Sequence, residues 1–229
     1  MAAPRFCEFA TRQELAEALA ETVATKLQEA IGARQGAVLA VSGGATPALF
    51  FEALSRQQLD WHKVVVTLVD ERFVPPTSDR SNEELVRSKL LQNAARTARF
   101  AGLYSPTDTV EEAARAANAG IALLGKPFDV AVLGMGLDGH TASFFPDAPN
   151  LTKLTDPAGK SRVMPVRAPS ANEPRLTLTL PIIADARFVA LHIEGEDKRR
   201  ALETALETRR PVAAVFDHAA SPVQVYWAP

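Results

Sequence analysis

The chain has 229 residues, a formal net charge of −2 and a hydrophobic share of 47%. This near-neutral balance provides no field that would attract nucleic acid or an anionic membrane, so we expect neither as a partner. Length and apolar share suit a single domain over residues 1–229 with a full hydrophobic core.

The N-terminal residues contain no apolar core of the length found in signal peptides. No apolar run approaches the length of about 20 residues that spans a bilayer. Cys7 is the single cysteine, which excludes an intrachain disulfide and is consistent with a reducing compartment. We therefore expect a cytoplasmic protein. Because Cys7 precedes the first predicted element, it is a poor candidate for a nucleophile.

Amphipathic helices alternate with apolar strands along the chain. Thr11 and Glu14 have the form of a capping box, and a first helix follows with apolar residues at helical spacing. Apolar runs predict strands at 37–41, 64–69, 129–133, 188–193 and 223–227. Further helices are predicted at 47–54, 82–91, 111–124 and 198–208. The strand runs are almost continuously apolar, which is typical of parallel strands covered on both faces. We predict an α/β fold with a doubly wound, mostly parallel sheet and helices on both faces.

In such sheets, ligands bind beyond the carboxyl ends of the strands, so the loops that follow strands are the candidate sites. The first is Ser42-Gly43-Gly44, which turns sharply after a strand. Thr46 is predicted to cap the next helix, with Pro47 in its first turn. Glycines and a helix start would offer backbone N–H groups to a phosphate or oxyanion. The alternative is a plain turn without a ligand.

Charged residues at 70–72 follow a second apolar strand, where charges are costly unless they are paired or functional. The guanidinium of Arg72 suits a phosphate. Asp70 or Glu71 would orient a sugar hydroxyl or take part in proton transfer. The alternative is a structural ion pair at the strand end.

The third loop, GMGLDGH at 134–140, carries the strongest signal. It matches G-x-G-x-x-G, but no long helix follows it, so the dinucleotide-binding interpretation fails. His140 lies two residues after Asp138 in a turn that also contains Gly136 and Gly139. A histidine there is a candidate general base, and a nearby carboxylate would fix its tautomer. The alternative is a structural histidine.

Arg175 begins the strand-like run RLTLTLP, and Lys198 follows the strand predicted at 188–193. Each would supply positive charge to a phosphate. The polar segment 145–174 is interpreted as a long excursion that contributes to the site, and whether it moves as a lid stays open. His62, His192 and His218 have no glycine-loop setting and are interpreted as structural. The sequence contains neither a G-x-S-x-G elbow nor an H-E-x-x-H or Cys/His cluster. We expect neither an acyl-enzyme nor a metal, and no cofactor.

Taken in order and spacing, the motifs SGGATP, DERFVPPTSDRSN, GMGLDGHTASFFP and RLTLTLP resemble the 6-phosphogluconolactonase family over nearly the whole chain. The related glucosamine-6-phosphate deaminase/isomerase family shares the fold. Those deaminases usually carry an Ile-Ala-Phe-Asn-Glu-Pro-like run after Asp-Gly-His, where this chain has Thr-Ala-Ser-Phe-Phe-Pro. They also tend to have an aromatic residue at the position of Arg72. Both differences favour the lactonase.

The resemblance implies a modified Rossmann-like, glucosamine-6-phosphate isomerase-like fold and hydrolysis of 6-phosphoglucono-1,5-lactone to 6-phosphogluconate in the oxidative pentose phosphate pathway. His140 would be the general base, oriented by Asp138 or Asp70, a choice that the sequence leaves open. Arg72 and Lys198 would hold the phosphate, with Arg175 a weaker candidate. Backbone N–H groups of 42–46 or 136–139 would stabilise the carbonyl oxygen.

A glucosamine-6-phosphate deaminase/isomerase and a non-catalytic sugar-phosphate sensor are the alternative functions. The expected partner is a small sugar-phosphate lactone. The oligomeric state is not fixed by the sequence, and a monomer is compatible with it.

Overall fold

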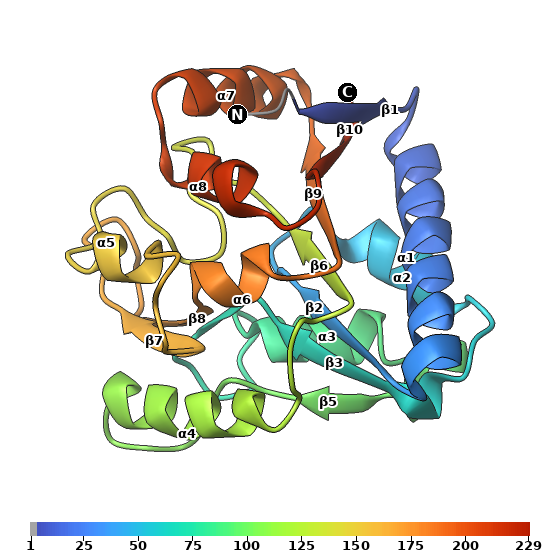
Figure 1. Ribbon diagram of the computed structural model, residues 1–229, viewed down its shortest axis with the longest axis horizontal. Helices are drawn as coiled ribbons and strands as arrows, with labels where there is room; N and C mark the ends of the chain where they lie inside the picture. The colour runs from blue at the N-terminus through green and yellow to red at the C-terminus, as the bar shows by residue number, and fades with distance from the viewer. Residues whose placement is uncertain (1–3) are drawn as a thin grey trace.

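The computed structural model describes residues 4–229, which form one large parallel sheet, a small antiparallel sheet and the helices that cover them (Figure 1). The seven strands of the large sheet are, in spatial order, β1 (Arg5–Glu8), β10 (Gln224–Ala228), β9 (Phe188–Glu194), β6 (Val130–Leu133), β2 (Ala37–Val41), β3 (Val64–Leu68) and β5 (Arg99–Ala101). All of their pairings are parallel. The apolar runs thus form the sheet that their continuous hydrophobicity predicts.

Helices lie on both faces of this sheet, as predicted: α1 and α2 lie on one side, and α6 and α8 on the other (Figure 1). The helices are α1 (Arg12–Arg34), α2 (Ala48–Ser55), α3 (Asn82–Lys89), α4 (Val110–Ala122), α5 (Leu151–Leu154), α6 (Leu180–Ala184), α7 (Glu196–Glu207) and α8 (Pro211–His218), with short 3₁₀ turns η1 (Trp61–Lys63) and η2 (Asn93–Thr97). None of the helices within residues 4–229 combines the length and the apolar character needed to cross a membrane.

The long helix α1 shows how the pattern becomes packing. Thr11 accepts a hydrogen bond from the backbone N–H of Glu14, which confirms the N-terminal half of the predicted capping box. The apolar stripe of α1 is fully or almost fully buried, and it consists of Leu15, Leu19, Val23, Leu27 and Ile31. Burial of each such side chain contributes about 1.5–3 kcal/mol, so this stripe fixes α1 on the sheet.

The strand order reverses between β2 and β6. The chain proceeds from β2 to β3 and β5 in one direction, then crosses to β6 and continues through β9 and β10 in the other. At such a reversal, the loops that leave the two strands diverge and open a crevice. The loops that follow β2 and β6 are the glycine turn at 42–46 and the histidine loop at 134–140.

Two features of the sheets differ from the prediction. Strand β1 pairs in parallel with β10, with Cys7 opposite Tyr226, so Cys7 lies in an ordered strand. The segments around 70–72 and 175–178 form a separate three-stranded antiparallel sheet of β4 (Asp70–Arg72), β8 (Arg175–Leu178) and β7 (Val163–Val166). The charged triplet of β4 has no strand-like hydrophobicity, so its pairing with β8 could not be read from its composition.

Candidate active site

A pocket of about 350 Å³ lies over the carboxyl ends of β2 and β6. The predicted site residues that line it are Ser42, Gly43, Gly44, Thr46, Asp70, Arg72, Gly136, His140, Arg175 and Lys198. Segments far apart in the sequence therefore meet in one cavity, as the strand reversal predicts. Asp138, Glu71 and Gly139 are not among the lining residues.

The turn after β2 depends on two glycines for different reasons. A Cβ at Gly43 would lie 2.0 Å from Oδ1 of Asn82, so only glycine fits against that side chain. Gly44 has φ +96°, a conformation that favours glycine. The prediction that Thr46 caps the next helix is wrong, since α2 begins at Ala48 after Pro47 and has no side-chain cap. No side chain therefore caps the first N–H groups of α2. The start of this helix borders the pocket, because Thr46 and Pro47 line it.

His140 and Asp138 form a close pair in the loop after β6. Nδ1 of His140 lies 2.6 Å from Oδ1 of Asp138, and the backbone N–H of His140 donates to the same oxygen at 3.2 Å. A carboxylate accepts hydrogen bonds only, so Nδ1 carries the proton and Nε2 of the neutral ring has the lone pair of a base. The ring packs against Phe145 with centroids 4.5 Å apart.

The glycines of this loop serve the same geometry. A Cβ at Gly136 would lie 2.2 Å from Nδ1 of His140 and 2.4 Å from Oδ1 of Asp138, so the pair exists because position 136 has no side chain. The Gly136 N–H donates to the carbonyl of His140, and Thr141 Oγ1 donates to that of Gly134. Gly139 has φ +81° and packs against Arg210, outside the pocket. Gly139 shapes the loop but does not line the predicted binding site.

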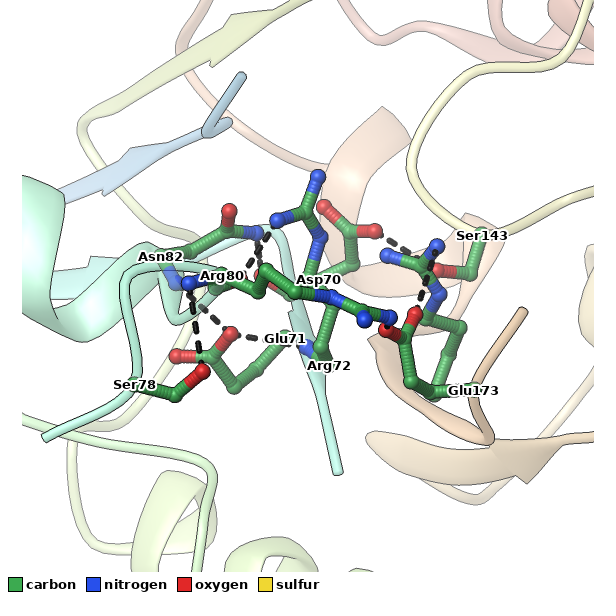
Figure 2. Close-up of polar contacts among 9 residues, drawn as sticks. Asp70, Glu71, Arg72, Ser78, Arg80, Asn82, Ser143 and Glu173 are labelled. Atoms are coloured by element: carbon green, nitrogen blue, oxygen red, sulfur yellow. Dashed lines mark hydrogen bonds and ion pairs between the residues drawn. The ribbon is translucent and has the colours of Figure 1, made fainter. Parts of the chain in front are cut away.

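Asp70 has a different partner. Its carboxylate accepts a hydrogen bond from Ser143 Oγ at 2.6 Å, as Figure 2 shows, while its backbone carbonyl accepts one from the Asn82 side chain at 2.8 Å. The geometry thus favours Asp138 over Asp70 as the residue that orients His140. Asp70 is almost fully buried and lines the pocket beside Arg175.

The prediction that Glu71 contacts a substrate is not supported by its position. Glu71 is fully buried and does not line the pocket. Its carboxylate accepts hydrogen bonds from the backbone N–H groups of Arg72 and Asn82, as Figure 2 shows. It also accepts hydrogen bonds from the hydroxyl of Ser81 and from the backbone N–H of Glu83. Burial raises the pKa of Glu71, and these hydrogen bonds oppose that effect. Glu71 therefore anchors the start of α3, a structural role that uses hydrogen bonds and not the ion pair expected as the alternative.

Arg72 and Arg175 lie directly opposite each other on β4 and β8. Like charges at opposed positions of antiparallel strands destabilise the pair unless an anion lies between or beside them. Arg72 donates a hydrogen bond to the carbonyl of Arg80. Arg175 lies 3.7 Å from Glu173, and its Nε is buried without a partner. Burial lowers the pKa of Arg175, an effect opposed by the Asp70 carboxylate.

Lys198, near the start of α7, provides a further positive charge. Its Nζ donates to the carbonyl of Met135 at 2.6 Å, which ties α7 to the histidine loop. Burial lowers the pKa of Lys198, and the carboxylate of Asp138 opposes this. The pocket thus presents cations from the β4–β8 sheet and from α7 near the imidazole of His140.

Several lining residues were not predicted. Asn82 lies against Gly43 and donates a hydrogen bond to the carbonyl of Asp70. Phe145, from the segment 145–174, packs against the ring of His140 and the guanidinium of Arg175. That segment does contribute to the pocket, as expected. His192 was interpreted as structural but lines the pocket. Its place near the carboxyl end of a predicted strand is the one signal that the sequence offered, and the strands that flank β9 decide that it faces the pocket.

The chain belongs to the family of glucosamine-6-phosphate isomerases and 6-phosphogluconolactonases, whose model matches residues 10–227. It is 57% identical to a 6-phosphogluconolactonase of Mesorhizobium japonicum over 96% of this chain and 94% of that protein. A crystal structure of a 6-phosphogluconolactonase from Shewanella baltica superposes with a TM-score of 0.96 at 39% identity, covering 100% of this chain and 99% of that one. A monomeric glucosamine-6-phosphate deaminase shares the fold, with a TM-score of 0.74 at 21% identity over 98% and 97% of the two chains.

Proposed function

We propose that this protein is a 6-phosphogluconolactonase that hydrolyses 6-phospho-D-glucono-1,5-lactone to 6-phospho-D-gluconate. The observation that carries the proposal is that His140, paired with Asp138 behind it, lines a pocket that is also lined by Arg72, Arg175 and Lys198. A base with a free lone pair beside an anion-binding wall suits a substrate that has an ester carbonyl at one end and a phosphate at the other. Relatives at 57% and 52% identity carry this name, which favours the lactonase over the deaminase.

In the proposed reaction, Nε2 of His140 takes a proton from water as the oxygen attacks the lactone carbonyl. The carbonyl π electrons move to oxygen and give a tetrahedral oxyanion. As the oxyanion collapses, the bond to the ring oxygen breaks, and the imidazolium returns its proton to that oxygen. Asp138 stabilises the imidazolium and keeps the ring in the required tautomer. General-base catalysis of this kind contributes about 10²–10⁴-fold to the rate.

The remaining residues would bind and polarise the substrate. Backbone N–H groups of residues 43–46 and of residues 137 and 138 are the candidates for stabilising the oxyanion, since those of Ser42, Gly136 and Gly139 already donate to backbone carbonyls. Arg72 and Arg175, opposed on two strands, would share the phosphate with Lys198. The ammonium of Lys198 already donates to the carbonyl of Met135, just before the histidine loop. It would therefore bind the phosphate and hold the histidine loop in place at the same time.

The test is a coupled assay in which the lactone is generated freshly and its disappearance is followed above the spontaneous rate. Turnover supports the proposal. Release of ammonia from glucosamine 6-phosphate would instead identify a deaminase, and binding without any turnover would identify a sensor. The single domain over 1–229, the cytoplasmic location and the independence from metals and cofactors stay predictions, and the oligomeric state stays open.

A further inference from the structure

His192 lies near the carboxyl end of β9, and its side chain is 3% exposed. Ala190 of β9 is the register partner of Val132 in β6, and side chains alternate along a strand, so His192 and Val132 point to the same face of the sheet. Both residues line the pocket. His192 is therefore part of the wall of the candidate active site.

The hydrogen bonds of His192 define which ring nitrogen is available. Nε2 lies 3.1 Å from Oε1 of Glu194. Because a carboxylate offers only acceptor atoms, Nε2 carries the proton of the neutral ring, and Nδ1 is left as an acceptor. Nδ1 is buried and has no hydrogen-bond partner. An edge-on contact with the ring of Phe50, with centroids 6.2 Å apart, holds the imidazole in this orientation.

A second unpartnered polar atom belongs to the same pocket: Oγ of Ser42 is also buried without a hydrogen bond. Unpaired buried polar atoms are costly and uncommon, and a ligand that supplies the missing partner removes that cost. Strand β6 lies between β2 and β9 in the sheet, and Gly134 is the first residue after β6. A Cβ added at Gly134 would meet only the Cβ of Ser42, at 4.0 Å. The absence of a side chain at 134 leaves room for a ligand on this side.

The missing partner of Nδ1 must be a donor. A phosphate dianion or a carboxylate brings no proton, so it cannot satisfy an acceptor nitrogen. A sugar hydroxyl can donate to Nδ1. Another sugar hydroxyl can pair with Ser42, whose own hydroxyl both donates and accepts. This chemistry separates the wall at His192 from the cationic wall formed by Arg72 and Arg175.

We propose that His192 is a specificity-determining residue whose Nδ1 accepts a hydrogen bond from a ring or chain hydroxyl of the bound sugar phosphate. The inference rests on the proposed function and assigns to that site the residue that recognises the polyol part of the ligand. Its role is in binding, and it takes no part in the proton transfer at His140.

Two amide substitutions separate this role from a structural one. In His192→Asn, the amide lies near the former position of Nδ1 and keeps an acceptor there while the contact with Glu194 is lost. In His192→Gln, the amide lies near the former position of Nε2 and keeps the contact with Glu194 while the acceptor at Nδ1 is lost. Binding of 6-phosphogluconate to both variants and to the wild type is measured by calorimetry, with thermal unfolding measured on the same samples.

We expect His192→Gln to bind 6-phosphogluconate about tenfold more weakly than the wild type, the size of one lost hydrogen bond, and His192→Asn to bind more tightly than His192→Gln. Equal binding by the two variants, or weaker binding by His192→Asn, would overturn the proposal, because the contact with Glu194 would then be the one that matters. If neither variant folds, a set of monodeoxy analogues of 6-phosphogluconate with the wild type decides: at least one must bind about tenfold more weakly, and equal affinities overturn the proposal.

Lactone turnover by the wild-type preparation is measured alongside. Absence of turnover would overturn the proposed function, whatever the variants bind. Turnover without the expected difference between His192→Asn and His192→Gln would overturn only the assignment of His192.

Discussion

A Cβ atom at Gly136 would lie 2.2 Å from Nδ1 of His140, so the imidazole rests against a backbone position that tolerates no side chain. The same Cβ would lie 2.4 Å from Oδ1 of Asp138. The glycine that begins the turn after Met135 is thus a condition for the contact between base and carboxylate.

Gly136→Ala should lower kcat about 10²-fold, because it displaces the base from its carboxylate and from the substrate. The measurement is steady-state lactone hydrolysis. Gly32→Ala is the matched control, since a Cβ at Gly32 meets nothing within 4 Å in the interior of α1. Full activity in Gly136→Ala would show that the pair does not need this geometry.

Asp138→Asn and Asp70→Asn separate the two carboxylates that the sequence left as alternatives. Asn at 138 can hold His140 in the wrong tautomer, and the corresponding Asp-to-Asn change in a Ser-His-Asp triad lowers kcat by about 10⁴-fold. Asn at 70 can still accept the hydrogen bond of Ser143. We expect the loss of kcat in Asp138→Asn to exceed that in Asp70→Asn by at least about tenfold. The reverse order would make Asp70 the orienting residue.

Arg72→Ala and Arg175→Ala should each raise KM for the lactone, with a smaller effect on kcat, because uniform binding of the phosphate is lost. Loss of one charge-assisted contact corresponds to about 1.5–3 kcal/mol, or about 10–100-fold. The affinity for 6-phosphogluconate should fall in parallel. An unchanged KM in both variants would exclude the phosphate from the β4–β8 wall.

Glu71→Gln tests the structural role assigned to that residue. An amide NH₂ cannot accept the hydrogen bonds that arrive at one of the two carboxylate oxygens, so we expect about 2–4 kcal/mol of destabilisation with little change in KM. A rise in KM of tenfold or more without destabilisation would restore Glu71 as a binding residue.

The pH dependence of unfolding gives a second readout for Glu71. Its folded pKa is raised above the ordinary value of 4.5, chiefly by burial, so the folded state binds the proton more tightly than the unfolded state. This contribution to stability is present below the unfolded pKa and is lost as pH rises through the raised folded value. In chemical denaturation at several pH values, the unfolding free energy of the wild type relative to that of Glu71→Gln should therefore fall as pH rises from the unfolded pKa through the raised folded pKa. An identical pH dependence in the two proteins would contradict the raised pKa.

The sequence predicted the parts of the fold that depend on hydrophobic pattern. Continuous apolar runs such as 64–69 can only be buried strands or helices, and their length and β-branched content favour strands. The strand β4 escaped prediction because Asp70, Glu71 and Arg72 are held by backbone pairing with β8 and not by apolar burial. The sequence also did not predict that the side chains of Asp70 and Glu71 point to different places. Asp70 lines the pocket, and Glu71 binds the start of α3.

The same limit applied to the site. The loop motif identified His140, because a histidine in a glycine-rich turn after a strand is unusual. The choice between Asp138 and Asp70 depended on where two carboxylates point, which spacing does not determine. His192 was missed because its place in the pocket follows from the neighbours of β9 in the sheet, which the order of strands along the chain does not reveal.

The central claim is that Nε2 of His140 is the base that activates water. The most direct test measures lactone turnover and 6-phosphogluconate affinity of His140→Asn together. We predict that kcat falls by at least about 10²-fold while the dissociation constant stays within about threefold, since the base acts on the transition state. Turnover at the wild-type rate in this variant would contradict the account.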